Sequence, residues 1–337
     1  MTLKINQMKN FINKTKRPLI SGFCLIVALF ILGSAGYSQD STATAAHHDS
    51  TAVPVVPDAP AKPRPVKNTF QTGQVIDGQT VMVPVKGTLE ADIQHRFGSV
   101  QNGYQDLWGI YGIANIRFGF LYTPIDNLEI GFGIAKVNML WDGSAKYAIW
   151  KQSSEFPVSV TYYGNIAVKT VKNPDNVLFK YESERWSFFN ELMIARKIND
   201  KLSVQIGFSI SHQNSVPGYY TKVDTANVLF KEQKFNMYSF SFVMRYKLTE
   251  GTSFILDYEQ PLTSWATDNP HPNFGFGFEF NTSGHTFQLF ADNFTLLNTQ
   301  QNAMYNANNP FGYTDNGVKY PGGQFHIGFN ITRLWNF

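Results

Sequence analysis

Hydrophobic and polar residues alternate along much of the chain from Thr88 onward. Segment 201–213 shows the pattern best: Leu202, Val204, Ile206, Phe208 and Ile210 lie on one face, with Ser203, Gln205, Gly207, Ser209 and Ser211 on the other. A period of two puts successive side chains on opposite sides of an extended strand. The pattern therefore predicts β-strands with one apolar and one polar face, and it predicts no convincing helix in this part of the chain.

The alternation predicts twelve strands. They are 88–97, 112–123, 127–138, 145–152, 157–170, 184–197, 201–213, 235–249, 252–260, 272–281, 284–293 and 322–333. The pattern is weakest in 145–152, so ten or fourteen strands stay open as alternatives.

Short and long connections alternate between these strands. The short ones are 124–127, 199–201, 249–251 and 282–284, and the long ones are 98–111, 171–183, 214–234, 261–271 and 294–321. Outer-membrane barrels have short periplasmic turns and longer external loops. A closed barrel also leaves no strand edge unpaired in lipid. The sequence thus predicts an all-β fold: a transmembrane antiparallel up-and-down β-barrel of about twelve strands over residues 88–337. A soluble β-sandwich or secreted barrel would also alternate, but its apolar faces would point inward.

The first part of the chain has the pattern of an export signal. Basic residues between Lys4 and Arg17 precede an apolar stretch over 19–32 and a group of small residues. This order is typical of a signal peptide, which we expect to span residues 1–38 and to be cleaved after Ser38, or alternatively after Gly36. An uncleaved membrane anchor is a further alternative.

Two segments separate this signal from the predicted barrel. Residues 39–67 are rich in Ala, Thr and Pro, which predicts a disordered periplasmic linker. Residues 68–87 contain a possible hairpin that turns at Asp77-Gly78. We interpret 68–87 as a periplasmic collar or as an insertion into the barrel mouth.

Composition agrees with a barrel and excludes several chemistries. Aromatic residues make up 15% of the chain and charged residues 16%, against about 25% charged residues in soluble domains. Loss of residues 1–38 would leave 23 basic and 25 acidic residues and would remove the only cysteine, Cys24. We therefore expect no nucleic-acid partner, no disulfide and no thiol catalysis. No haem, phosphate-loop or metal-ligand spacing is evident, so we expect no cofactor and no metal.

Aromatic residues near strand ends suit the two membrane interfaces, although core packing could also account for any one of them. They are Tyr122, Trp150, Trp186, Tyr246, Tyr258 and Trp335. The chain stops at Phe337 after an amphipathic strand. This ending resembles the terminal assembly signal of bacterial outer-membrane barrels. The resemblance implies an outer-membrane location, with outer-membrane lipids and the barrel-assembly machinery as partners.

An ordered set of short motifs identifies a further resemblance. The motifs are His95-Arg-Phe-Gly98, Asn115-Ile-Arg117 with Gly119, Asp126-Asn-Leu-Glu-Ile-Gly-Phe-Gly133, Asp142-Gly143 and Lys146-Tyr147. Over residues 68–337 the chain resembles the family catalogued as domain of unknown function 5777, found in Bacteroidota-type bacteria. The resemblance implies an outer-membrane β-barrel. It implies no substrate and no catalytic residue.

Strand parity assigns charged side chains to the barrel lumen. The candidates are Glu90, Asp92, Arg96, Arg117, Glu129, Glu191, Arg245, Asp257, Glu279 and Asp292. An Arg or Lys facing lipid at mid-membrane would cost about 2–4 kcal/mol, so we expect these charges to lie inside.

Two functions follow from such a lumen. The charges could line a narrow aqueous path, which predicts channel-like transport of small solutes. Alternatively they could pair across the lumen and close it. That would make a sealed structural or adaptor barrel that presents loops 214–234 and 294–321 to a protein partner. Loop 294–321 could fold inward as a constriction or reach outward.

A lipid hydrolase is a minor alternative. Parity turns His95 and His212 outward near the external rim, and Ser99 and Ser211 are close to them in sequence. A serine hydrolase needs a serine within reach of a histidine. Ser211 points inward by parity, however, and no G-x-S-x-G motif surrounds either serine. We therefore predict no enzyme and no catalytic residue.

Overall fold

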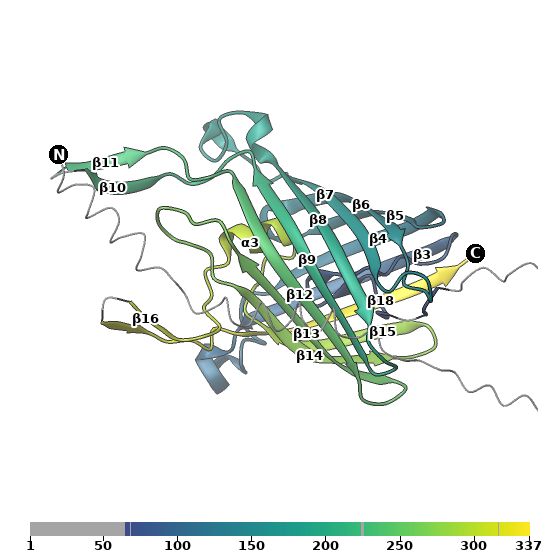
Figure 1. The fold of residues 1–337 in the computed structure, drawn as a ribbon. Helices are drawn as coiled ribbons and strands as arrows, with labels where there is room; N and C mark the ends of the chain where they lie inside the picture. The colour runs from purple at the N-terminus through teal and green to yellow at the C-terminus, as the bar shows by residue number, and fades with distance from the viewer. Residues whose placement is uncertain (1–64, 68, 224–225, 316) are drawn as a thin grey trace, which may run out of the picture. The chain divides into compact units, whose positions relative to one another are not determined.

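The computed structural model describes residues 65–67, 69–223, 226–315 and 317–337. The predicted signal peptide and nearly all of the predicted linker lie outside these ranges. The described part forms a closed antiparallel barrel (Figure 1). Its strands are β3 (Thr88–Ser99), β4 (Asn115–Ile125), β5 (Leu128–Ala135), β6 (Leu140–Trp150), β7 (Ser159–Lys169), β8 (Trp186–Lys197), β9 (Leu202–Gln213), β12 (Asn236–Lys247), β13 (Thr252–Pro261), β14 (Asn273–Asn281), β15 (His285–Asp292) and β18 (His326–Asn336). The prediction of a twelve-stranded up-and-down barrel is confirmed.

The barrel closes where its last strand, β18, pairs with its first, β3. Asn336 lies opposite Thr88 in this register, and the Thr88 hydroxyl donates a hydrogen bond of 2.6 Å to Asn336 Oδ1. The Phe337 amide donates to the carbonyl of Gly87 over 3.4 Å. Gly87 has a φ of +84°, a conformation that favours glycine. The two ends of the barrel wall therefore meet beside Gly87, and no strand edge of the barrel is left open.

Most predicted strands differ from the observed ones by one to three residues at an end, and two differ by more. The weakly patterned strand 145–152 runs from Leu140 to Trp150, and the last strand runs from His326 to Asn336 rather than over 322–333. The strand at Leu140 starts early because the preceding connection is short. Asn138 and Met139 both have positive φ there and reverse the chain tightly.

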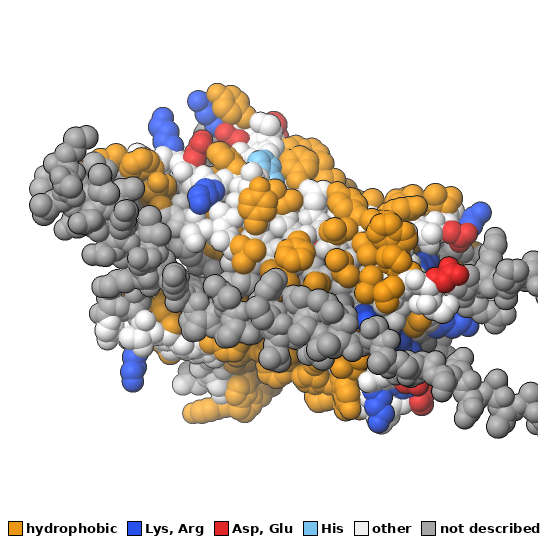
Figure 2. Space-filling model, in the orientation of Figure 1, with side chains coloured by type: hydrophobic (Ala, Val, Ile, Leu, Met, Phe, Trp, Pro, Cys, Tyr) orange, Lys and Arg blue, Asp and Glu red, His pale blue; other side chains and the backbone are white. Residues whose placement is uncertain are grey.

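The outer surface of the barrel is apolar. Phe276 and Phe278 are 39% and 45% exposed, while the residues between them and beside them face inward. Figure 2 shows hydrophobic side chains over the middle of the wall, with charged side chains gathered toward its two ends. All six predicted interface aromatics lie on this outer face, each within three residues of a strand end: Tyr122, Trp150, Trp186, Tyr246, Tyr258 and Trp335.

The two ends of the barrel differ in their connections. One end, here called the short-turn end, carries the predicted short turns and both ends of the barrel wall. The other, the long-loop end, carries the hairpin of β10 (Tyr219–Val223) and β11 (Ala226–Phe230) and that of β16 (Tyr313–Asp315) and β17 (Val318–Tyr320). Both hairpins extend beyond the strands on the same side (Figure 1). Among the described helices, none has the length and apolar character needed to cross a membrane.

Two segments fill the inside of the barrel. Residues 70–83, the interior hairpin, contain β1 (Gln74–Val75) and β2 (Gly78–Gln79) and lead into β3 from the short-turn end. The helix α3 (Thr299–Tyr305) enters from the long-loop end as part of the loop between β15 and β18. The predicted hairpin therefore exists, but it lies among inward side chains of the wall rather than in a collar. Its turn falls at Ile76 and Asp77, one residue before the predicted position.

Candidate functional site in the barrel lumen

Inward side chains of the wall bind the backbone of the interior hairpin. The amides of Asp77 and Gly78 both donate to Asp257 Oδ2, at 3.1 and 2.9 Å. The amide of Ile76 donates to Gln288 Oε1 at 3.0 Å. These contacts join residues about 180 to 212 positions apart in the sequence. The predicted lumen residue Asp257 therefore holds the tip of the hairpin.

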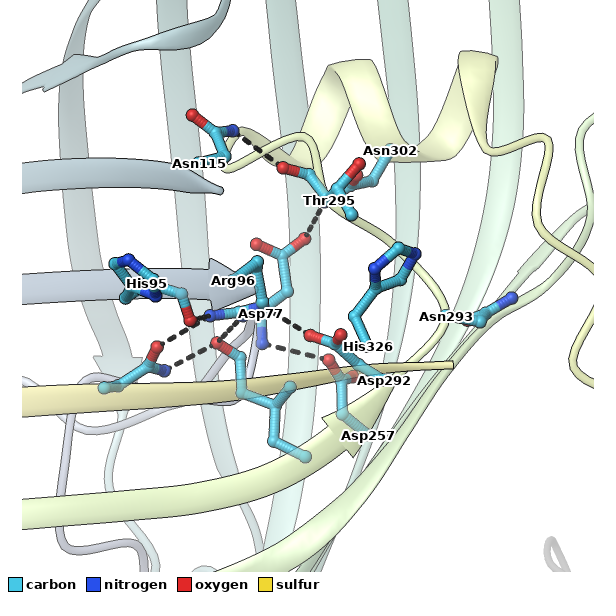
Figure 3. Close-up of polar contacts among 12 residues, drawn as sticks. Asp77, His95, Arg96, Asn115, Asp257, Asp292, Asn293, Thr295, Asn302 and His326 are labelled. Carbon is cyan, nitrogen blue, oxygen red and sulfur yellow. Dashed lines mark hydrogen bonds and ion pairs between the residues drawn. The ribbon is translucent and has the colours of Figure 1, made fainter. Parts of the chain in front are cut away.

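Arg96 binds the other side of the hairpin tip (Figure 3). Its guanidinium and the Asn330 side chain both donate to the carbonyl oxygen of Ile76, at 3.2 and 2.8 Å. Arg96 also forms an ion pair with Asp292 and lies 4.4 Å from the centre of the Phe290 ring. Arg96 is fully buried, so these contacts replace its hydration. They tie strands β3, β15 and β18 to the hairpin.

Ile76 adopts a backbone conformation that is rare for its residue type. Its φ is +58°, which crowds a β-branched side chain. Such a conformation costs on the order of 1–3 kcal/mol and persists only where the surroundings enforce it. Here the wall side chains that bind the Ile76 amide and carbonyl enforce it.

The hairpin also has an apolar anchor. Val75 and Ile76 are fully buried, and Val81 is nearly so. They pack in one cluster with Phe70 and with wall side chains that include Val243, Ile255, Phe290 and Phe189. Burial of each such side chain contributes about 1.5–3 kcal/mol. The hairpin is thus bound through both its backbone and its apolar side chains.

The helix α3 is bound in a different way, because much of its buried surface is polar. Gln300, Gln301 and Asn302 are all buried. Four polar atoms in or beside the helix are buried without a hydrogen-bond partner among the described residues: Asn298 Oδ1, Gln300 Oε1, Gln301 Nε2 and Asn302 Oδ1. Each unmet group costs about 1–3 kcal/mol. The helix is therefore held less firmly than the hairpin.

A side-chain hydrogen bond joins the hairpin to α3. Asn302 Nδ2 donates to Asp77 Oδ2 over 2.8 Å (Figure 3). Burial raises the pKa of the Asp77 carboxyl, because desolvation outweighs the opposing effects of Arg96 and of this hydrogen bond. The segment from the short-turn end thus contacts the segment from the long-loop end directly.

All ten charged residues assigned to the lumen by parity lie on the inward face of the wall, as the burial patterns of their strands show. Arg245 pairs with Glu279 at 2.8 Å. Arg117 pairs with Asp142 at 2.7 Å and with Asp92 at 3.6 Å. The charges are therefore partly paired with one another.

The ionisable groups of the interior that sequence reasoning missed include Asp77, Asp142, Lys146 and Glu259. Glu259 lies two residues after Asp257 on β13, so the same alternation predicts that it points inward. Asp142 was assigned no inward position because the strand that carries it was predicted to begin at residue 145. Lys146, which lies 3.6 Å from Glu129, belongs to the same strand. Alternation could not place Asp77, because it belongs to the interior hairpin and not to a strand of the wall.

The packed interior leaves little free volume. A cavity of about 40 Å³ lies between the hairpin and the wall formed by β3 to β7. A second, of about 10 Å³, lies along β4 to β6. Leu297 and Asn298 line both cavities and separate them. Since a cavity needs about 10–15 Å³ to hold one water, the larger one has room for a few small species. Among the described residues, no group of three or more His, Cys, Asp or Glu side chains could hold a metal ion.

The two outward histidines have other partners than serine. His95 stacks on Phe329 with ring centres 5.0 Å apart. His212 forms hydrogen bonds with Asn236 and Asn214. Ser211 is fully buried and points inward. This arrangement brings no described serine to either imidazole.

A comparison with known families decides what kind of barrel this is. Residues 70–335 match the family model described as "Membrane bound beta barrel domain (DUF5777)". The chain belongs to this family. The apolar outer surface therefore faces lipid, and the family resemblance of the motifs is confirmed. The search of curated proteins gave no match.

Several solved structures are similar to this DUF5777 barrel in architecture. The COG4313 outer membrane channel from Pseudomonas putida F1 has 13% identity and a TM-score of 0.42, covering 75% of this chain and 97% of its own. The KdgM porin has 10% identity and a TM-score of 0.38, with coverage of 74% and 99%. The toluene transporter TbuX from Ralstonia pickettii has 9% identity and a TM-score of 0.36, with coverage of 75% and 90%. Identities and TM-scores this low carry no functional information.

Proposed function

We propose that this protein is an outer-membrane channel for small solutes, closed here by its own interior segments. The observation that carries the proposal is the inner face of the wall, where polar and charged side chains outnumber the apolar ones that anchor the hairpin. A wall that only had to enclose a permanent core would gain from apolar side chains, because buried charges are costly to desolvate. A polar wall suits a lumen that admits water. The predicted export signal and the membrane-bound family support the outer-membrane location.

The loop that carries α3 is the element best suited to open the lumen. Four of its buried polar atoms lack partners among the described residues and would gain hydrogen bonds to water on leaving the barrel. Leu297, which lies between the two cavities, belongs to the same loop and packs with Ala135, Leu140 and Ala167. Outward movement of residues 296–306 would join the two cavities along the β4–β6 wall.

Conductance in planar lipid bilayers tests this function. We expect the folded wild-type barrel to give small, intermittent currents. Replacement of residues 296–306 by a short Gly/Ser linker should give larger and steadier currents. Shortening of β16–β17, residues 313–320 of the same loop, is the matched control and should leave the currents unchanged, because this hairpin points away from the lumen. The absence of any current from a folded wild-type sample would contradict the channel function.

A sealed adaptor barrel is the second candidate, and the small cavity volume favours it. The projecting hairpins supply an adaptor surface. Tyr220 and Leu229 on the first are 69% and 52% exposed, and Val318 on the second is 54% exposed. An adaptor would bind a protein partner through loops 214–234 and 294–321. Under this function the wild type would be silent, and deletion of residues 296–318 would abolish partner binding.

A further inference from the structure

The larger cavity has an unusual ratio of acids to bases. Its lining includes Glu90, Asp92, Asp142, Arg117 and Lys146. Arg117 serves two carboxylates, Asp142 at 2.7 Å and Asp92 at 3.6 Å. When ionised, this group of three has one negative charge more than it can balance internally.

The second base of the cavity is shared in the same way. Lys146 donates to the carbonyl oxygen of Gly73 at 2.8 Å and lies 3.6 Å from Glu129. Glu90 lines the cavity beside these groups, is 5% exposed, and has an Oε2 atom without a hydrogen-bond partner among the described residues. Lys146 thus pairs with Glu129 rather than with Glu90, and the free oxygen of Glu90 belongs to a buried side chain on the cavity wall.

Acidic side chains also outnumber basic ones over the rest of the inward face. Among the described residues, its most deeply buried charged side chains are nine carboxylates, Glu90, Asp92, Glu129, Asp142, Glu191, Asp257, Glu259, Glu279 and Asp292, and four bases, Arg96, Arg117, Lys146 and Arg245. Lys169, less buried, adds a fifth base at the long-loop end, 5.6 Å from the Tyr305 ring of α3. Among the described residues, the hydrogen bonds to three of the carboxylates, Glu191, Asp257 and Glu259, come from neutral groups. The lumen is thus negative wherever water enters it, and such a field attracts cations and repels anions.

We propose that the cavity beside Glu90 is a weak site for a small monovalent cation such as K⁺, and that it makes the path cation-selective. The selectivity part rests on the channel function proposed above. The described side chains form no multidentate carboxylate cage, so the site should bind weakly, as conduction requires. Amide oxygens of the lining residues Gln74, Gln94 and Asn298 can complete the cation's ligands together with water.

Two measurements test the proposal, and the first does not depend on conduction. The thermal unfolding midpoint is measured in KCl and in tetramethylammonium chloride at equal ionic strength. Tetramethylammonium is the larger cation, and its methyl groups keep its charge away from the oxygen atoms that line the cavity. We expect the midpoint to be higher in KCl by about 2–4 °C for a K⁺ concentration well above the dissociation constant. Glu90→Gln should remove the difference, while Glu155→Gln, at an exposed position outside the lumen, should preserve it.

The second measurement is the reversal potential of single channels in a KCl gradient. We expect K⁺ to permeate on the order of tenfold more readily than Cl⁻, and Glu90→Gln to reduce that ratio severalfold. Glu90→Gln replaces the carboxyl by a neutral group of nearly the same size and adds no buried charge, so the variant should fold.

The outcomes separate the two proposals. Currents that favour Cl⁻, or show no preference, would overturn the cation inference and leave the channel function standing. Absence of currents would overturn the channel function, and the salt comparison would then decide the cation site alone. Equal midpoints in the two salts would overturn the site in either case.

Discussion

Ile76 offers the sharpest test of how the interior hairpin is held. Its side chain is fully buried and fills the space beside Gly275, where a Cβ atom would lie only 3.0 Å from Ile76 Cγ2. Truncation of a buried Ile to Ala typically costs about 2–5 kcal/mol. Alanine also tolerates the positive φ better than a β-branched residue, which offsets about 1 kcal/mol. For Ile76→Ala we therefore expect a net loss of about 2 kcal/mol in hairpin docking. That loss corresponds to a roughly 30-fold larger undocked population.

Hydrogen exchange followed by mass spectrometry measures this population directly. In Ile76→Ala, amides of the hairpin should exchange about 30-fold faster, while amides of the twelve strands keep their protection. Ile130→Ala is the control, since Ile130 is 46% exposed on the outer face of β5 and does not contact the hairpin. If hairpin exchange in Ile76→Ala matched the control, the apolar anchor would contribute little. If the strands lost protection as well, the hairpin would be part of the barrel's cooperative core rather than a separately docked segment.

Three further predictions concern the contacts of the wall. Asp257→Ala leaves the amides of Asp77 and Gly78 without an acceptor. Hydrogen exchange of the hairpin amides should therefore become about 10- to 100-fold faster. An unchanged exchange rate would refute the role of Asp257. Gly78→Val should displace the hairpin tip, because its Cβ would lie 2.6 Å from Asp257 Oδ1, and the single-channel current should rise if the tip narrows the path. Gly133→Ala would place a Cβ 2.1 Å from Arg117 Nη2 and 2.7 Å from Asp142 Oδ2, so the buried ion pair must shift. We expect the free energy of unfolding, measured in urea, to fall by about 1–3 kcal/mol. Gly143→Ala, whose Cβ would have 3.8 Å of clearance, should unfold like the wild type.

Alternation was sufficient to predict the wall of the barrel. One face of each strand meets lipid and the other meets the interior, so the period of two determines which residues point inward. This is why the inward position of Arg117 or Glu279 could be read directly from parity. Parity cannot describe segments that lie inside the barrel. The interior hairpin is too short to show a period, and Gln300 to Asn302 look like ordinary loop residues until a helix places them in the lumen.

Pairing between charges was also beyond the sequence. Which carboxylate meets Arg117 depends on the register of β4, β5 and β6, and the early start of β6 changes that register. The sequence left open whether loop 294–321 folds inward or outward. The structure shows that it does both: α3 lies inside and β16–β17 project outside.

The meeting of the two wall ends beside Gly87 has a consequence for biogenesis. Three parts of the chain meet at that point: residues 84–87, which join the interior hairpin to β3 and are here called the hairpin root, the first residue of β3, and Phe337. The pairing of β18 with β3 and the docking of the hairpin inside the barrel therefore both depend on the same few residues. A nascent barrel whose seam is still open has no fixed support for the hairpin root, so the newly inserted protein should acquire its closed interior only as the ring is completed.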